Sequence, residues 1–341
     1  MKRTLMLFAA AAAAAILLAG CTAENGDIPD EWPWYDPDAD DEPWTEVTDG
    51  RFGTLPDYIK IWHSPAVLKG KKAEAWIATA DLSVAQFHVW GINDPELDGT
   101  TDALRTPSQV YNDFNEPVLV INGGYFYSED GTNYPASLAV ENGKLLSPNI
   151  NYASEDWKTM YYPTKAAFIQ HADGSVEAAW TYFQDADNHW IYDIPAQNGY
   201  GSTPLAIPDA TFPCEGRPFE AKTAIGAGPV LLKGGEVVNS WRYECLPGDS
   251  DVNCKNPDPR TAVGITADGK LVLFVCEGRD MAEGVKGYST ENVALILKAF
   301  GCTDAINLDG GGSSCLLVNG LETIKPSDGK QRSVGSCIYI K

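Results

Sequence analysis

The chain is short of histidine and methionine, and its basic residues are outnumbered almost two to one by acidic ones. Among 341 residues there are four His and four Met, and 25 Lys and Arg stand against 47 Asp and Glu, for a formal net charge of −22. A protein this acidic repels polyanions, so we expect no nucleic-acid partner, and an anionic ligand would need a local cationic pocket. Cys-x-x-Cys pairs and His/Cys ligand spacings are also missing, so we expect no structural zinc.

No apolar run beyond residue 21 is long enough to span a bilayer. The first residues have instead the three-part build of a signal peptide, with Lys2 and Arg3 before the apolar stretch 5–18. The ending 18–21, Leu-Ala-Gly-Cys, resembles a bacterial lipobox, which implies cleavage before Cys21 and lipid attachment to it; an ordinary secretory signal is the alternative. We predict a lipoprotein signal peptide over 1–20. The protein would then be held to the bacterial envelope, at the outer membrane and periplasmic or surface-exposed, through the lipid on Cys21 only.

Basic residues are absent between Glu24 and Glu46, where ten Asp and Glu are interspersed with four prolines and three tryptophans. A segment that repels itself and carries few apolar residues cannot build a core of its own. We interpret residues 21–50 as an acidic tether. No Pro-, Ser- or Gly-rich linker divides the remainder, so we expect residues 51–341 to form the folded domain.

Hairpin signals dominate that remainder. Five dipeptides separate pairs of β-like apolar runs and supply the positive φ values of type I′ turns: Asn142-Gly143, Asp173-Gly174, Gly234-Gly235, Asp268-Gly269 and Asn319-Gly320. Helix signals are few: Thr106-Pro107 fits the start of a short helix running to about Phe114, and Ser289 begins one that Gly301 ends. The predicted class is α+β, β-rich, with mostly antiparallel hairpins and a few helices packed on the sheet.

Seven cysteines remain beyond Cys21, an odd number, so at least one stays unpaired within a single chain. Cys245 and Cys254 flank a polar loop and are the pair that we expect to form a disulfide in an exported protein. Cys276, Cys315 and Cys337 lie in apolar runs and are typical of buried thiols.

The most informative stretch is 305–318. A short apolar strand ends at Leu308, another apolar run begins at Cys315, and between them lie Asp309, the glycines 310–312 and the hydroxyls of Ser313 and Ser314. Three consecutive glycines leave backbone N–H groups open to close approach, and such groups can form an anion-binding concavity. The alternative is a tight turn between two core strands.

Three further elements place polar groups where apolar strands begin or end. Asn122-Gly123-Gly124-Tyr125 follows the strand 118–121, Arg260 stands at the start of a strand in the segment 258–264, and Glu277-Gly278-Arg279 follows the strand 271–276. Sites often form at such strand ends. In an acidic protein that binds an anion, Arg260 is the first candidate for a bidentate phosphate contact, and a rim ion pair is the alternative.

Together these elements resemble the phosphodiester glycosidases related to the lysosomal uncovering enzyme, which removes N-acetylglucosamine from a sugar phosphodiester. The resemblance covers roughly residues 70–341, and its motifs are 304–313 (DAINLDGGGS), 260–264 (RTAVG), 122–126 (NGGYF) and 226–230 (GAGPV). It implies a hydrolase that cleaves the C1–O bond of a sugar-1-phosphodiester. Glu277 departs from the Asp that we expect in many relatives.

The resemblance also assigns roles. Asp309 would be the nucleophile or base at C1, Glu277 the second carboxylate, and Arg260 with the N–H groups of 310–312 would hold the leaving phosphate. The expected substrate-binding residues are Asn122, Gly123, Gly124, Tyr125, Asn307, Gly310, Gly311, Gly312, Ser313, Ser314 and Arg279. We expect no cofactor, while the sequence leaves a divalent metal near Asp309 open.

Two other functions fit the same residues. One is a non-catalytic surface lipoprotein that binds carbohydrate, with sugar-stacking platforms among Trp180, Tyr182, Trp190, Tyr192 and Tyr200, although such residues are more often packed in a core. The other is a phosphodiesterase that cleaves the P–O bond.

Overall fold

The computed structural model describes residues 43–93, 102–248 and 252–341. The expected signal peptide, Cys21 and most of the expected tether lie outside the described residues. The last tether residues do contact the body: β1 (Thr45–Glu46) pairs with β2 (Ile59–His63), and the Trp44 ring packs edge-on against Phe300 at 5.9 Å between centroids.

The described chain folds into three large antiparallel sheets and two small hairpins. The eight-stranded sheet has the order β1-β2-β5-β20-β19-β21-β17-β18, and its further members are β5 (Ala75–Asp81), β20 (Lys270–Cys276), β19 (Arg260–Thr266), β21 (Cys302–Asn307), β17 (Val230–Lys233) and β18 (Glu236–Val237). The hairpins are β3 (Val67–Leu68) with β4 (Lys71–Lys72), and β8 (Phe126–Glu129) with β9 (Thr132–Pro135).

The other two sheets are smaller. The seven-stranded sheet has the order β11-β10-β16-β12-β13-β14-β15, namely β11 (Lys144–Ser147), β10 (Ala139–Glu141), β16 (Thr223–Gly226), β12 (Lys165–Gln170), β13 (Val176–Asp185), β14 (Asn188–Tyr192) and β15 (Arg217–Pro218). The five-stranded sheet has the order β23-β22-β7-β24-β6, namely β23 (Leu321–Glu322), β22 (Leu316–Val318), β7 (Leu119–Asn122), β24 (Ser336–Ile340) and β6 (Phe87–Gly91).

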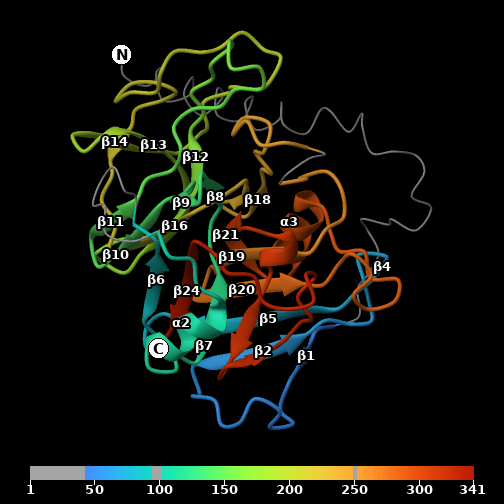
Figure 1. The fold of residues 1–341 in the computed structure, drawn as a ribbon. Helices are drawn as coiled ribbons and strands as arrows, with labels where there is room; N and C mark the ends of the chain where they lie inside the picture. Colours follow the sequence, from blue (N-terminus) through green and yellow to red (C-terminus); the bar gives the residue numbers. More distant parts are fainter. Residues whose placement is uncertain (1–42, 94–101, 249–251) are drawn as a thin grey trace, which may run out of the picture.

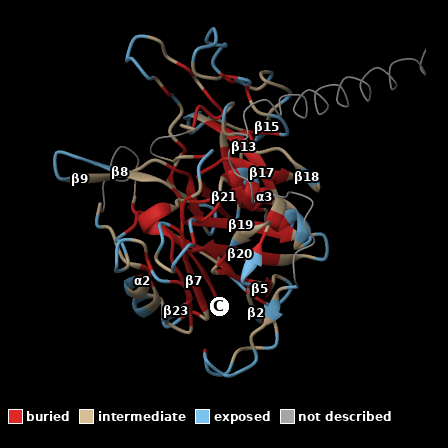
Figure 2. Cartoon of the chain, turned by 90° about the vertical axis from the view of Figure 1, so that its right-hand side faces the viewer, coloured by how far each residue is buried: buried red, intermediate tan, exposed pale blue. Residues whose placement is uncertain are grey.

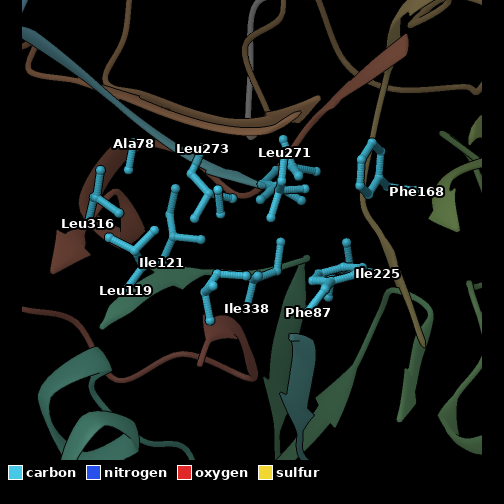
Figure 3. Packing of buried hydrophobic residues seen from close by; sticks show 14 of the residues in the cluster. Ala78, Phe87, Leu119, Ile121, Phe168, Ile225, Leu271, Leu273, Leu316 and Ile338 are labelled. Carbon is cyan, nitrogen blue, oxygen red and sulfur yellow. The ribbon is translucent and has the colours of Figure 1, made fainter. Parts of the chain in front are cut away.

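The main core lies between the eight-stranded sheet and the other two. Side chains alternate between the faces of a strand, so Trp76, Ala78 and Ala80 of β5 enter this core, while Ala75 and Ile77 face the opposite side. Figure 3 shows the interior packing, where Leu271 and Leu273 of β20 lie opposite Ile338 of β24. Burial of these apolar faces holds the layers together.

The two helices of the described residues cover the outer faces of the sheets (Figure 1). Helix α3 (Thr290–Ala299) buries Val293, Ile296 and Leu297 against β17, β19 and β21, and the Ser289 hydroxyl accepts a hydrogen bond from the Asn292 N–H at its start. Helix α2 (Pro107–Asp113) packs on the five-stranded sheet. Its start is a capping box between Thr106 and Gln109. Both helices begin where the sequence predicts.

The β-rich, antiparallel prediction is confirmed. Each of the five turn dipeptides joins an antiparallel pair: β10–β11, β12–β13, β17–β18, β19–β20 and β22–β23. Asn142 and Gly143 have φ values of 50° and 78°, as a type I′ turn requires. The helical part is small, so the molecule is closer to an all-β protein than the predicted α+β class suggests.

Two expectations about side chains are changed by the structure. The disulfide between Cys245 and Cys254 is not formed, and both residues are buried free thiols. Three of the aromatic residues considered as sugar platforms, Trp180, Tyr182 and Tyr192, are at most 3% exposed and serve as core packing. In the described part of the chain, no helix is long and apolar enough to cross a membrane.

Candidate active site

Two of the predicted motifs meet where strands of two different sheets end. Asn122 ends β7, and its side-chain N–H donates to the Asp309 carbonyl at 2.6 Å. In return, the Asp309 N–H donates to the Gly123 carbonyl at 2.9 Å. The Asn122 Oδ1 accepts hydrogen bonds from the Thr261 hydroxyl at 2.9 Å and the Cys315 N–H at 3.1 Å. Asn122 is thus fully occupied in fixing the segment that carries Asp309.

A pocket opens beside this junction, and five parts of the chain line it: Tyr125, Val252, Asp258, Arg260, Arg279, Asn307, Asp309, Gly310, Gly311, Gly312 and Arg332. Three of the four predicted motifs contribute to it. The fourth, 226–230, contributes indirectly, because the Gly228 carbonyl accepts a hydrogen bond from the Tyr125 hydroxyl at 2.5 Å.

The glycine run forms a short 3₁₀ turn over 311–313. Its N–H groups are less available than an open anion nest requires. The Gly310 N–H donates to the carboxylate of its own neighbour Asp309 at 2.9 Å, and the Gly311 N–H donates to the Pro259 carbonyl at 2.9 Å. Within the described chain, only the Gly312 N–H of the three has no assigned partner.

Asp309 combines burial with several hydrogen-bond donors. Burial of its carboxyl group raises the pKa of Asp309 to about 6, against the lowering effects of the Ser313 hydroxyl, the Arg332 charge and the Gly310 N–H. The nearby carboxylate of Asp258 also raises this pKa. A carboxyl group tuned in this way is mostly ionised at neutral pH and is still a usable base.

Two arginines cover the glycine turn. A Cβ built on Gly311 would stand 2.7 Å from Arg279 Nη2, and one built on Gly312 would stand 2.2 Å from Arg332 Nη2. The side chains of Arg279 and Arg332 are 47% and 42% exposed, so neither is sealed inside the protein. They supply the local cationic pocket that an anionic ligand requires in an acidic protein.

Each of these arginines is oriented by a carboxylate. Arg279 binds Asp258 bidentately, with Nε–Oδ1 at 2.8 Å and Nη2–Oδ2 at 3.1 Å. Arg332 donates to the Asp328 carboxylate from Nε at 2.9 Å and from Nη2 at 2.7 Å. Both keep Nη1 directed elsewhere: Arg279 toward the Ser327 hydroxyl and Arg332 toward the Ser313 hydroxyl, each at 3.4 Å. These long contacts are weak enough for a ligand oxygen to replace them.

Arg260 lies at the pocket wall but is committed to the backbone. It is 1% exposed. Its guanidinium donates to four carbonyls, those of Tyr288, Val252, Asn253 and Asn256. A guanidinium has five N–H donors, so little remains for the bidentate phosphate contact that the sequence suggested. The geometry gives Arg260 the task of holding the loop 252–256 against the start of α3.

Glu277 is not among the residues that line the pocket. It is 3% exposed, and its Oε1 accepts the Lys325 N–H at 2.8 Å, while Oε2 is buried without a partner. Burial raises the pKa of Glu277. The loop that begins at Lys325 carries Ser327, Asp328 and Arg332. Glu277 therefore holds in place the segment that delivers Arg332.

Tyr125 and Asn307 form another part of the pocket wall. The Asn307 Nδ2 donates to the carbonyls of Gly228 at 3.0 Å and Leu308 at 2.6 Å. The Oδ1 of the same side chain is buried and has no hydrogen-bond partner among the described residues. Burial raises the pKa of Tyr125 well above its usual value, so the hydroxyl remains a hydrogen-bond donor.

The remaining predicted residues support the pocket wall. Gly123 and Gly124 are buried, and a Cβ on either would stand within 2.4 Å of another residue, so only glycine fits. Ser314 is buried beside the Thr261 hydroxyl at 3.1 Å. In the part of the chain that the structure describes, no group of three or more His, Cys, Asp or Glu side chains is placed to hold a metal ion.

The sequence did not indicate three pocket residues, Val252 and the charged Asp258 and Arg332. Asp258 stands two residues before Arg260, inside a segment that the sequence already singles out. Arg332 belongs to the stretch 325–332, which carries Lys325, Lys330 and Arg332 against the single acid Asp328. A locally basic loop in a strongly acidic protein was the available signal.

The structure thus defines a β-rich, antiparallel domain with a polar pocket at the ends of its strands. The profile of the phosphodiester glycosidase family matches residues 115–341, which is more than half of the chain. The chain therefore belongs to the phosphodiester glycosidase family.

Individual relatives match over shorter segments. The SPbeta prophage-derived uncharacterized protein YomE of Bacillus subtilis is 38% identical over 92 residues, which are 27% of this chain and 14% of that protein. The N-acetylglucosamine-1-phosphodiester alpha-N-acetylglucosaminidase of mouse is 37% identical over 78 residues, 23% of this chain and 14% of the mouse protein. The matches thus span far less than two thirds of these relatives.

Solved structures share the fold over most of the chain. The catalytic domain of zebrafish N-acetylglucosamine-1-phosphodiester alpha-N-acetylglucosaminidase superposes with a TM-score of 0.54 at 22% identity, covering 87% of this chain and 81% of that one. A hypothetical protein from Synechocystis gives a TM-score of 0.56 at 17% identity, covering 89% of this chain and 64% of its own.

Proposed function

We propose that this protein hydrolyses the glycosidic C1–O bond of a sugar-1-phosphodiester. The observation that carries the proposal is the placement of one ionisable carboxyl group, Asp309, beside two ligand-accessible arginines in one pocket. Membership of the phosphodiester glycosidase family supports the same reaction class.

The chemistry requires anion stabilisation more than acid catalysis. Cleavage of the C1–O bond expels a phosphate monoester, whose second pKa is about 6, so it leaves largely without a proton. Arg279 and Arg332 with the Gly312 N–H hold the phosphoryl oxygens and stabilise the charge that develops on the leaving oxygen. Asp309, with its pKa of about 6, is ionised at neutral pH and acts at C1 as nucleophile or as base toward water.

The second carboxylate of the pocket is then Asp258 and not Glu277. Asp258 lies in the pocket and is bound to Arg279, so it orients the phosphate-binding arginine. Glu277 acts through the loop that carries Arg332. Tyr125 and Asn307 shape the end of the pocket where the sugar binds.

We further propose that the protein works in the cell envelope, attached to the membrane through lipid on Cys21. The support is the signal-peptide pattern and the small residues before this cysteine. Metabolic labelling with a fatty acid, in the wild type and in Cys21→Ser, tests the attachment; equal labelling of the two chains would disprove it.

A panel of sugar-1-phosphodiesters, assayed with the wild type and Asp309→Asn, tests the reaction. Turnover that the variant abolishes supports the proposal. Hydrolysis in ¹⁸O-labelled water then separates the two bonds: label in the sugar indicates C1–O cleavage, and label in the phosphate indicates a P–O-cleaving phosphodiesterase. Binding of the panel without any turnover would favour the non-catalytic carbohydrate-binding function.

A further inference from the structure

A hairpin of two short strands projects from the body next to the pocket. Strands β8 and β9 pair in the register Phe126 with Pro135 and Tyr127 with Tyr134, and a two-residue turn of Asp130 and Gly131 joins them. Both turn residues have positive φ, 50° and 84°, as in a type I′ hairpin. Figure 2 shows this hairpin extending outward, with its tip exposed.

The hairpin continues directly from the pocket wall. Tyr125 lines the pocket and is still paired across the hairpin, because its carbonyl accepts the Ala136 N–H at 2.9 Å. Side chains two residues apart on an extended strand point to the same face. Tyr127 therefore stands on the same face as Tyr125, one step further from the pocket.

An aromatic pair occupies that outer step. The rings of Tyr127 and Tyr134 stack with centroids 5.2 Å apart and an interplanar angle of 19°. Tyr127 is 42% exposed, whereas the preceding Phe126 packs into the core cluster of the five-stranded sheet. The hairpin thus has one face for packing and one aromatic face that solvent reaches.

Hydrogen bonds from the opposite face hold the hairpin in place. The Asn133 side-chain N–H donates to the Asp102 carbonyl at 3.0 Å, and the Ser128 hydroxyl donates to Asn133 Oδ1 at 2.6 Å. The first bond ties the outer strand β9 to Asp102, and the second ties β9 to β8. A platform that is ordered before binding loses less entropy when a ligand arrives.

We propose that Tyr127 and Tyr134 form a stacking platform for a second sugar unit, linked to the sugar held in the pocket. This rests on the proposed function, because it takes the pocket as the site of the released sugar. Sugar rings present C–H groups on their faces, and a large, rigid aromatic surface next to a polar pocket suits them. The ligand class is then an oligosaccharide-1-phosphodiester rather than a monosaccharide one.

The alternative is that the stacked pair only stabilises the hairpin, as cross-strand aromatic pairs do. The two interpretations predict different effects of these tyrosines on the preference for longer ligands. A purely structural pair changes the thermal midpoint and affects short and long ligands equally. A platform changes the preference for the longer ligand.

The binding test uses the Asp309→Asn chain, so that no ligand is consumed. N-acetylchitotriose, mannotriose and maltotriose are titrated by saturation-transfer NMR against the matching monosaccharides. We expect at least one trisaccharide to bind roughly three- to tenfold more tightly than its monosaccharide. Tyr127→Ala and Tyr134→Ala should remove that difference, while Tyr127→Phe keeps the ring and retains it.

Leu321→Ala is the matched control, because Leu321 is 51% exposed and lies on β23 at the far end of the β22–β23 hairpin. This variant should keep the length preference. No trisaccharide preference in the parent chain, or a preference that survives both alanine variants, overturns the platform.

Kinetics separate this proposal from the reaction itself. With wild-type Asp309, the ratio of kcat/KM for a trisaccharide over a monosaccharide methyl phosphodiester should fall toward one in Tyr127→Ala. Turnover without any effect of ligand length would disprove the platform and support the proposed reaction. A trisaccharide preference that depends on Tyr127, in a chain without turnover, would remove the reaction and keep the platform.

Discussion

The guanidinium of Arg332 lies directly over Gly312, at a spot where a Cβ would stand 2.2 Å from its Nη2. The same Cβ would stand 2.3 Å from Asp328 Oδ2, so both members of this ion pair require glycine at position 312. Gly312 has no positive φ, whereas Gly311 has a φ of 57°. Substitution at Gly312 therefore tests the arginine contact without the backbone strain that alanine at Gly311 would add.

We expect Gly312→Ala to displace Arg332 and lower affinity for inorganic phosphate at least tenfold, with a small change in thermal midpoint. Titration calorimetry with phosphate and thermal unfolding measure the two effects. Gly199→Ala is the control, since its Cβ would meet only the Arg242 carbonyl at an ordinary 3.6 Å. Unchanged phosphate affinity in Gly312→Ala would remove Arg332 from the anion site.

Asp309→Asn should abolish turnover and should also make the protein more stable at neutral pH. The folded-state pKa of about 6 lies above the unfolded value of about 3.9, so the folded state binds the proton more tightly. Ionisation of Asp309 therefore costs stability, from nothing below pH 4 to about 3 kcal/mol above pH 6. Thermal unfolding of both chains at pH 4 and pH 8 measures the difference. A variant that is equally destabilised at the two pH values would contradict the raised pKa.

The pH dependence of activity follows from the same group. An ionised Asp309 is required, so kcat/KM should fall as the pH drops through about 6. Arg332 lowers this pKa by its charge, and Arg332→Gln should move the acid limb to higher pH. A pH–rate profile of both chains measures the shift. An acid limb that stays in place would show that the limb belongs to another group.

Much of the fold could be predicted from local sequence, and the site only in part. Turn dipeptides such as Asn142-Gly143 determine hairpins through their own backbone preferences, and the caps at Thr106 and Ser289 mark helix starts in the same way. The partners of a side chain are a tertiary property. No local sequence pattern indicates that the Asn122 side chain donates a hydrogen bond to the Asp309 carbonyl, because β7 and β21 belong to different sheets.

The assignment of Arg260 shows the same limit. Arg260 stands where a strand begins, and its sequence position resembles that of a ligand-binding residue. Its partners are the carbonyls of the loop 252–256, whose course the sequence does not give. The direction of the Glu277 side chain, in contrast, could be predicted from the alternation of side chains along β20. Val275 of β20 faces the main core, so the residue two positions later faces inward as well.

Arg260→Lys should behave as a folding variant. Lysine keeps the charge but cannot reach four carbonyls at once, so we expect a loss of about 3 kcal/mol in unfolding free energy. Activity on a phosphodiester and on a neutral-aglycone glycoside should fall by similar factors. Arg279→Lys should instead lower the phosphodiester rate selectively. A selective phosphodiester loss in Arg260→Lys would return the phosphate contact to Arg260.

Glu277 provides the sharpest separation between a catalytic and a positioning carboxyl group. Its Oε1 accepts the Lys325 N–H at 2.8 Å, and two residues further on Arg279 Nη1 contacts the Ser327 hydroxyl at 3.4 Å. The segment 277–279 therefore holds the loop of Arg332 at two points. Glu277→Gln preserves an acceptor oxygen for the Lys325 N–H, whereas Glu277→Ala removes that acceptor.

If Glu277 positions the loop, Glu277→Gln should keep at least half of the wild-type kcat, because no charge is needed at this position. Glu277→Ala should raise KM and weaken phosphate binding on the order of tenfold through the misplaced Arg332, which corresponds to roughly 1.4 kcal/mol. If Glu277 instead transferred a proton or attacked C1, the enzyme would lose most of its activity with either substitution, since neither an amide nor a methyl group can do this. Steady-state kinetics and phosphate titration of the two variants distinguish the two roles. If Glu277 positions the loop, Glu277→Gln stays active and Glu277→Ala does not; if Glu277 is catalytic, both variants lose most of their activity. A Gln variant as inactive as Asp309→Asn, in a chain that still binds phosphate normally, would make Glu277 catalytic after all.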